Sequence, residues 1–295
     1  MKMRIKKNKK KLVLLILLIV LAFIAVSIYL DNSFLQVTQY TVTSERIPQS
    51  FNNFKILQLS DLHSASFGEE NRTLLKKIDE QKPDIVVMTG DMVNTKDETF
   101  DVFLKFGKEV GKKYETYYIM GNHEQNLDES KREYIFSKLK ATGIKILNNE
   151  KVGITRGADQ INLYGMWFNL KYYKDANNAY TKDIYYDSAA MQKVIGDCDT
   201  SKYSVLLTHN PLYFDTYAGW DADLTLAGHI HGGMIRIPFI GGLLSPEHEF
   251  FPQYSGGKYH MGDKVLIVNR GLGNGNFGIR ILDRPEISVI SLQSK

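Results

Sequence analysis

The sequence contains very little cysteine: Cys198 is the single cysteine among 295 residues. One cysteine cannot form an internal disulfide, so core packing must stabilise the fold. A nucleophilic thiol would need a base beside it, and the polar stretch Gly196-Asp197-Cys198-Asp199 offers no matched one. We therefore interpret Cys198 as an incidental free thiol.

Acidic residues are absent from the first thirty positions, although seven basic residues stand there. These are Lys2, Arg4, Lys6, Lys7, Lys9, Lys10 and Lys11. Setting them aside leaves 30 basic residues against 33 acidic ones, so the folded part is slightly acidic. This balance argues against a basic stripe for nucleic acid. Internal repeats are absent too, and nothing in the sequence indicates an obligate protein partner.

The segment Leu12 to Leu30 is a run of 19 uncharged residues. As a helix it would span roughly 28 Å, close to the ~30 Å hydrocarbon core of a bilayer. The basic head, residues 1–11, is expected to stay in the cytoplasm, which predicts a single-pass protein of the cytoplasmic membrane with its domain outside. A signal peptide cleaved near Ala25-Val26-Ser27 is the alternative, but the apolar run exceeds the usual ~7–15 residues of a signal core. A buried helix of a soluble protein is a third interpretation.

Beyond this anchor, the chain divides into a polar segment and one domain. Residues 31–52 are expected to form a linker or to add an edge strand, and residues 53–295 form the domain. Periodicity up to residue 143 predicts strands at 54–59, 85–88 and 116–120, with helices at 71–81, 97–110 and 128–141. After residue 144 it predicts short strands separated by turns at 144–147, 152–155, 161–166, 204–207, 224–226, 234–237, 265–268 and 287–292, with one helix near 188–195. We infer two facing sheets covered by helices.

A tyrosine-rich stretch, residues 169–187, shows no firm periodicity. Long loops in compact domains are often binding loops or lids. The stretch could cover a substrate, rest on a membrane surface, or be an insertion whose tyrosines pack for stability.

Five of the seven histidines lie in short polar segments that follow predicted strands. Together with one segment that lacks histidine, these are Asp61-Leu62-His63, Gly90-Asp91, Gly121-Asn122-His123-Glu124, Thr208-His209 and Gly228-His229-Ile230-His231. Singly, most are weak signals, since a Gly-Asp pair is usually a turn. Carboxylates, imidazoles and an amide gathered at strand ends predict a two-metal hydrolytic site.

These segments resemble the motifs of the calcineurin-like metallophosphoesterase superfamily, in its membrane-associated bacterial branch. The similarity runs from about Phe54 to the end of the chain, and includes Leu207-Thr208-His209-Asn210-Pro211, Asn269-Arg270-Gly271-Leu272-Gly273 and Arg284-Pro285-Glu286-Ile287. The resemblance implies an α/β fold, a four-layer αββα sandwich of two mixed sheets. Both metals would lie at the carboxyl ends of its central strands.

The resemblance also implies roles for individual residues. Asp61, His63 and His231 would hold one metal, Asn122, His209 and His229 the other, and Asp91 would bridge both. Two dications ~3.5–4 Å apart repel each other, so an anionic bridge and a bridging hydroxide are needed between them. His123 would protonate the leaving oxygen, a contribution typically worth ~10²–10⁴ in rate. Glu124 is expected to lie behind the ligands and to orient His123.

Nitrogen and oxygen ligands without thiolate favour Mn²⁺, Fe or Zn²⁺ as the two divalent ions. Two other motifs have a weaker link to metal or cofactor binding. Gly271-Leu272-Gly273-Asn274-Gly275 lacks the spacing of a dinucleotide loop and is interpreted as a glycine-rich loop beside the metals. His248 and His260 are interpreted as surface residues rather than a third metal site.

We therefore predict a membrane-anchored hydrolase of phosphate mono- or diesters or pyrophosphates, with diesters favoured. A position beside the bilayer makes a lipid-linked or envelope-associated phosphate the expected substrate. One alternative is a secreted cyclic-nucleotide or nucleic-acid phosphodiesterase, which the acidic domain and the anchor disfavour. Another is a catalytically silent interaction module, which the complete ligand set argues against.

Overall fold

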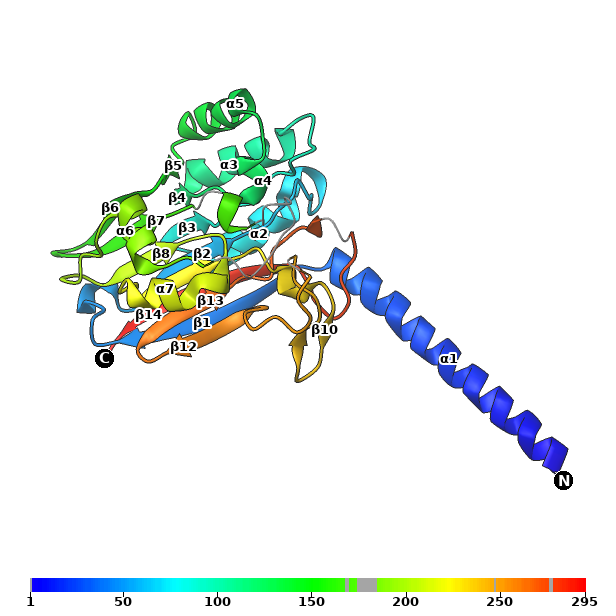
Figure 1. Ribbon diagram of the computed structural model, residues 1–295. Helices are drawn as coiled ribbons and strands as arrows, with labels where there is room; N and C mark the ends of the chain where they lie inside the picture. Colours follow the sequence, from blue (N-terminus) through cyan, green and yellow to red (C-terminus); the bar gives the residue numbers. More distant parts are fainter. Residues whose placement is uncertain (1, 168–169, 174–184, 247, 276–277) are drawn as a thin grey trace.

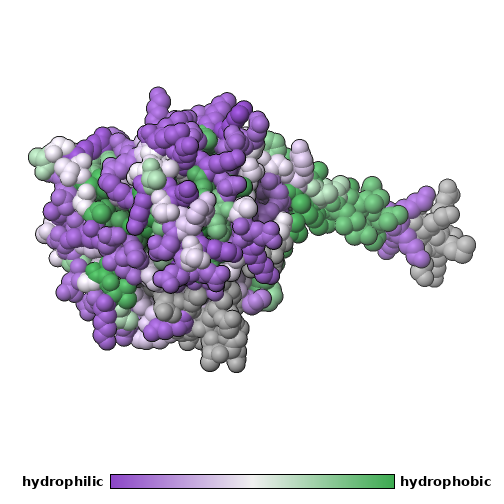
Figure 2. Space-filling view, turned by 90° about the horizontal axis from the view of Figure 1, so that it is seen from above, coloured by the Kyte–Doolittle hydropathy of each residue, from purple (hydrophilic) through white to green (hydrophobic). Residues whose placement is uncertain are grey.

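A long amino-terminal helix projects from a two-sheet domain in the computed structural model, which describes residues 2–167, 170–173, 185–246, 248–275 and 278–295 (Figure 1). This helix, α1 (Lys2–Ser33), contains one segment, Lys9–Ser33, that is long and apolar enough to cross a membrane. Its apolar side chains from Leu12 to Leu21 are exposed, and Figure 2 shows them as an apolar rod beside a mostly hydrophilic domain. The helix thus begins ten residues before the predicted span of 12–30 and ends three residues after it.

Two six-stranded sheets form the domain. The first has the order β1-β14-β2-β3-β4-β5, and the second β12-β13-β9-β8-β7-β6. The strands of the first sheet are β1 (Gln36–Ser44), β14 (Glu286–Ser294), β2 (Phe54–Leu59), β3 (Ile85–Met88), β4 (Glu115–Tyr118) and β5 (Lys145–Ile146). Those of the second are β12 (Gly257–Met261), β13 (Lys264–Val268), β9 (Leu224–Ala227), β8 (Ser204–Leu207), β7 (Asp159–Gly165) and β6 (Glu150–Arg156). Both sheets are mixed, since β14 pairs antiparallel with β2, and β12 and β6 pair antiparallel with their neighbours.

The segment between α1 and β2 contains an edge strand. β1 pairs in parallel with β14, with Gln36 opposite Glu286 and Ser44 opposite Ser294. The short helix η1 (Gln49–Phe51) follows and buries Phe51. Of the two expectations for residues 31–52, the structure has the edge strand, so the first sheet begins only three residues after α1.

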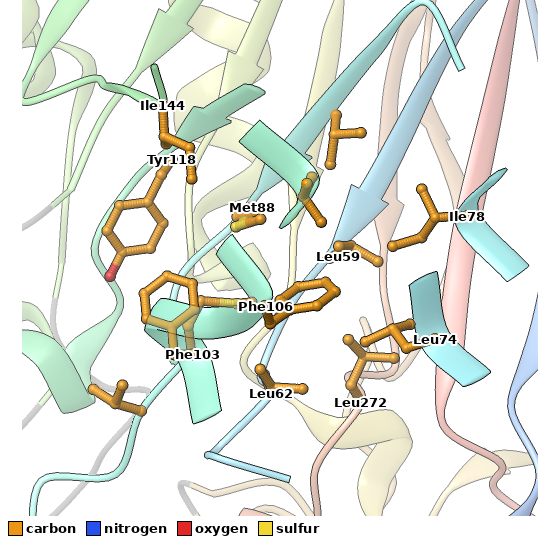
Figure 3. Packing of buried hydrophobic residues seen from close by; sticks show 14 of the residues in the cluster. Leu59, Leu62, Leu74, Ile78, Met88, Phe103, Phe106, Tyr118, Ile144 and Leu272 are labelled. Atoms are coloured by element: carbon orange, nitrogen blue, oxygen red, sulfur yellow. The ribbon is translucent and has the colours of Figure 1, made fainter. Parts of the chain in front are cut away.

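Apolar residues on both faces of the central strands explain the layers. In β3, Ile85 and Val87 belong to the core between the sheets, whereas Val86 and Met88 face the helices outside. The outer cluster of the first sheet packs under α2 (Arg72–Gln81), α3 (Asp101–Lys113) and α5 (Glu129–Lys140), as Figure 3 shows for Leu74, Phe103 and Phe106. On the second sheet, α6 (Ser188–Ile195) and α7 (Phe214–Gly219) cover a cluster rich in tyrosine. The predicted αββα sandwich is confirmed.

Several short elements differ from the sequence-based expectations. β12 and α7 were not predicted, and the helix expected from residue 97 begins at Asp101. The strand expected at 234–237 is reduced to β10 (Arg236–Ile237), which pairs with β11 (Gly241–Gly242) in a separate hairpin. Such two-residue strands carry too few residues to show a period of two.

Candidate metal site

The polar segments lie together because each follows a central strand. β2, β3 and β4 are parallel neighbours in the first sheet, and β8 and β9 are parallel neighbours in the second. Asp61, Asp91 and Asn122 follow the first three strands, and His209 and His229 follow the other two. Since parallel strands end at one edge of a sheet, all five side chains meet where the two sheets face each other.

Five residues of the polar segments, including three of those just named, have positive φ angles. The φ angles are 52° for Asp61, 48° for His63, 53° for Asp91, 73° for His229 and 51° for His231. Few residues other than glycine adopt this region, and holding each one there costs about 1–3 kcal/mol. The backbone therefore bends sharply at each of these positions and turns the side chains inward.

One group of ligand atoms comes from Asp61, His63 and His231, within 4.8 Å of one another. Nε2 of His63 lies 3.1 Å from Nε2 of His231, which lies 3.4 Å from Oδ1 of Asp61. The opposite nitrogen of His63, Nδ1, lies 2.9 Å from Oδ1 of Asn94, an acceptor. Nδ1 of His63 thus carries the ring proton, and its Nε2 points a lone pair at the neighbouring imidazole.

The second group consists of Asp91, His209 and His229. Nδ1 of His209 donates to the carbonyl of Thr89 over 2.7 Å, so its Nε2 faces Oδ2 of Asp91, 3.1 Å away. Burial alone would lower the pKa of His209, but the carboxylates of Asp91 and Asp61 outweigh it and raise this pKa to about 10. The site therefore favours a positive charge at Nε2, which a proton or a metal ion can supply.

Asp91 lies between the two groups. Its Oδ1 accepts the backbone N–H of His123 over 2.7 Å, which fixes the carboxylate. Its Oδ2 lies 3.1 Å from Nε2 of His209 and 4.0 Å from Nε2 of His63. Burial would raise the pKa of Asp91, but His209, His123 and His63 hold it well below its ordinary value.

The imidazoles around the first group favour their neutral forms. Burial lowers the pKa of His63, and burial together with His63 holds the pKa of His231 well below its ordinary value. Neutral imidazoles offer nitrogen lone pairs, which is the form that binds metals. In this buried space nitrogen lone pairs and carboxylate oxygens face each other. Bound cations would offset the repulsion between them, so the arrangement fits a pair of metal ions.

A pocket of about 160 Å³ opens above these groups, and Asn122 and His123 both line it. Asn122 is buried at the start of the short helix α4 (Asn122–Gln125), whereas His123 is half-buried. Nδ1 of His123 accepts the backbone N–H of Thr95 over 3.1 Å. The proton of a neutral His123 ring therefore resides on Nε2.

Glu124 holds a different part of the site from the one expected. Its buried carboxylate accepts four backbone N–H groups, those of Asp91, Met92, Val93 and Gly121, at 2.9, 2.7, 3.3 and 2.8 Å. Thr95, and not Glu124, contacts the His123 ring. The expectation that Glu124 orients His123 is therefore wrong. The side chain instead fixes the turn that carries Asp91. Burial, followed by the charge of Asp91, raises the pKa of Glu124 to about 7 against the opposing effect of these N–H groups.

Two positioning residues escaped the sequence analysis. Asn94 orients His63 and also donates from Nδ2 to the His63 carbonyl over 2.9 Å. Thr95 binds His123. Both follow Gly90-Asp91 within five residues, so the only available signal was their position in the same loop.

The remaining sequence motifs also have places in the structure. The loop from Gly271 to Gly275 lies against the metal site, where Gly273 donates its N–H to the Asp61 carbonyl over 2.6 Å. His248 is exposed and lines the pocket, whereas His260 lies on the exposed face of β12. The Cys198 thiol is half-buried, and burial raises its pKa.

The tyrosine-rich stretch lies partly outside the described residues, at 169 and 174–184. Of the rest, Tyr173 is buried, with its ring centroid 5.2 Å from that of His229. Tyr186 is buried against Tyr172 and Tyr213. Tyr172, Tyr173 and Tyr186 therefore pack in the fold, Tyr173 beside a candidate ligand, whereas Tyr185 is exposed.

Comparison with known proteins finds similarity to calcineurin-like phosphoesterases. The family model for calcineurin-like phosphoesterases matches residues 54–233. The metallophosphoesterase YkuE of Bacillus subtilis is 27% identical, over 90% of this chain and 88% of its own. The metallophosphoesterase Cj0846 of Campylobacter jejuni is 30% identical over 93% and 70%. The phosphodiesterase YaeI of Escherichia coli is 28% identical over 81% and 82%.

Proposed function

The chain belongs to the calcineurin-like phosphoesterase family, and on that premise we propose that it is a membrane-anchored hydrolase of phosphate diesters or pyrophosphates that uses two divalent metal ions. The observation that carries this proposal is the position of Asp91, whose Oδ2 faces a histidine of each ligand group. A single carboxylate oxygen in that position suits a bridge between two cations.

In this proposal Asp61, His63 and His231 hold one ion, and Asn122, His209 and His229 hold the other. Mn²⁺, Fe and Zn²⁺ all suit the nitrogen and oxygen donors. A bound pair of such ions activates water at neutral pH and neutralises phosphate oxygens.

The protein's own residues prepare the remaining chemistry. Thr95 keeps the ring proton of His123 on Nε2, the nitrogen from which His123 can donate to the leaving oxygen. Burial of Asp61, Asp91 and His209 excludes water from these ligands and strengthens their electrostatic interactions with a bound cation.

The size of the pocket restricts what it can enclose. Sites that bury a whole small ligand have volumes of ~300–1,000 Å³, whereas this pocket measures about 160 Å³ among the described residues. A phosphoryl group fits inside, and the rest of the substrate lies outside. This arrangement favours a phosphate attached to a larger body, such as a lipid-linked or envelope-associated substrate. The phosphodiesterase name of the Escherichia coli relative supports diesters.

The hydrolase proposal is tested with the full chain in detergent micelles and Mn²⁺. Bis-(p-nitrophenyl) phosphate and p-nitrophenyl phosphate report diester and monoester cleavage. We expect Asp91→Asn to abolish turnover, because the amide is neutral and a poor bridge. The matched control is Asp101→Asn at the exposed start of α3, which should retain full activity. If neither substrate is turned over while both metals are bound, the hydrolase proposal is refuted.

The membrane proposal follows from α1, whose apolar side chains are exposed along its length. The basic head before it favours a cytoplasmic amino terminus and a domain outside. Protease added to intact cells should then digest the domain. A domain protected until the membrane is permeabilised would contradict this orientation.

A further inference from the structure

A hairpin with an uncharged tip lies next to the foot of α1. It comprises β10, β11 and the return residues 248–251, and we call it the β10–β11 hairpin. Arg236 in β10 and Glu249 in the return residues carry charges outside this tip. Residues 237–246 carry no charged side chain. Phe251 donates its N–H to the Leu243 carbonyl over 2.9 Å, so the return segment folds back onto the hairpin.

Four large apolar side chains of this hairpin face solvent, a group we call the apolar rim. The rim consists of Phe239, which is fully exposed, Ile240 at 65%, Phe250 at 67% and Phe251 at 52% exposure. Exposed apolar residues grouped on one hairpin, unlike scattered single residues, mark an interaction surface.

Hydrogen bonds tie the hairpin to α1 through two adjacent residues. Ile281 exchanges backbone hydrogen bonds of 3.0 Å with Met234 and Arg236. The next residue, Leu282, donates its N–H to Oδ2 of Asp31 over 2.5 Å and to Oγ of Ser27 over 3.1 Å, both on α1. Leu282 and the rim residues Phe239 and Ile240 also line one groove. The rim residues Phe239 and Ile240 therefore lie close to the end of α1, as the neighbouring positions of β10 and α1 in Figure 1 indicate.

Residues of the hairpin side, and one residue bonded to α1, line the metal pocket. Met234, Pro246 and His248 line it from the hairpin side. Asn274 lines it from the other side and donates from Nδ2 to Oδ1 of Asn32, at the end of α1, over 2.7 Å. The pocket mouth thus lies between the foot of α1 and the hairpin.

We propose that the apolar rim is a second membrane contact, inserted into the interfacial region of the bilayer beside α1. A lipid bilayer is the occupant that the observations favour, because an exposed apolar helix ends at the rim and the hairpin tip is uncharged. Aromatic and aliphatic side chains partition into this region by burying apolar area. Two attachments, α1 and the rim, hold the pocket mouth at the level of the lipid headgroups.

This inference rests on the proposed membrane span but not on hydrolysis, so its test needs no substrate. The full chain carrying Cys198→Ser receives one cysteine at a time, by Ile240→Cys, Phe250→Cys, Leu18→Cys or Tyr134→Cys. Each cysteine is labelled with an environment-sensitive fluorophore, and the protein is placed in phosphatidylcholine–phosphatidylglycerol vesicles with or without spin-labelled lipid. Tyr134, an aromatic residue of α5 that is 48% exposed, is the matched control outside the rim.

We expect probes at 240 and 250 to emit at shorter wavelength and to lose intensity with spin-labelled lipid, as the probe at 18 does. The probe at 134 should do neither. Phe239→Asp combined with Ile240→Asp should abolish quenching at 250 and leave quenching at 18 unchanged, since burying each such side chain is worth roughly a tenfold change in partitioning.

Three results would overturn the proposal, and they can be told apart. Rim probes that behave like the probe at 134, while the probe at 18 is quenched, would refute the rim and leave the anchor. A blue shift at 240 and 250 without lipid quenching, varying with the protein-to-lipid ratio, would assign the rim to contact with a second copy of the chain. An unquenched probe at 18 would refute the membrane span itself, and the rim contact with it.

Discussion

Replacing Glu124 with glutamine tests whether this side chain holds the turn that carries Asp91. The carboxylate places one oxygen, Oε2, toward the N–H groups of Asp91 and Gly121, and the other, Oε1, toward those of Met92 and Val93. An amide has the same shape, but one of the two oxygens becomes an NH₂ group. In either orientation two buried N–H groups then face a donor.

The magnitude follows from these hydrogen bonds. A buried donor left without an acceptor costs about 1–3 kcal/mol, so two of them cost about 2–6 kcal/mol. A domain of this size loses roughly 2–4 °C in melting temperature per kcal/mol, which predicts a decrease of at least about 4 °C. Metal affinity should also fall, by about 10–100-fold, because the backbone that positions Asp91 is no longer fixed.

The assay is thermal unfolding of the full chain in detergent, followed by near-ultraviolet circular dichroism, together with metal content after dialysis. Glu133→Gln, on the surface of α5, is the matched control and should change neither quantity. A Glu124→Gln protein with the melting temperature and metal content of the parent would show that the four N–H groups do not depend on the carboxylate.

Three further changes test other parts of the site. Gly121→Ala would place a methyl group against Oδ1 of Asp91 and 2.6 Å from its backbone nitrogen; about 1–3 kcal/mol of stability and most activity should be lost, whereas Gly219→Ala, which has ordinary contacts, should be tolerated. The raised pKa of His209 predicts that protonation stabilises the metal-free fold fully below pH 6.5 and that this contribution is lost as the pH rises towards about 10; chemical unfolding of the metal-free protein and of His209→Asn across this range should show the difference, and parallel curves would contradict it. Because burial raises the pKa of Cys198, iodoacetamide should modify this thiol more slowly than free cysteine at pH 7, and Cys198→Ser should retain full activity.

The sequence predicted those elements whose signal is local. The strand at 85–88 could be recognised because Ile85 to Met88 are apolar on both faces, as a buried parallel strand requires. The candidate ligands could be found because each stands directly after such a strand. The family resemblance then implied which of them share a metal, and the structure brings Asp61 and His231 together across 170 residues.

The contacts of Glu124 could not be predicted in the same way. Its partners are backbone N–H groups of residues 91–93, about thirty positions earlier, and backbone groups leave no trace in residue identity. The β10–β11 hairpin also escaped, because Gly241 and Gly242 have no side chains to alternate. What holds these parts is tertiary contact, which single-sequence patterns do not record.

The parallel pairing of β1 with β14 has a consequence for when the first sheet can form. β1 follows α1 directly in the chain, and the strand it pairs with among the described residues, β14, lies 250 positions later, with Gln36 opposite Glu286. β1 therefore stays unpaired during synthesis until β14 has also been made. β14 also separates β1 from β2, so β1 cannot join the other strands of the first sheet before β14 is present. Removing β14 would leave β1, and α1 with it, without pairing to the rest of the first sheet.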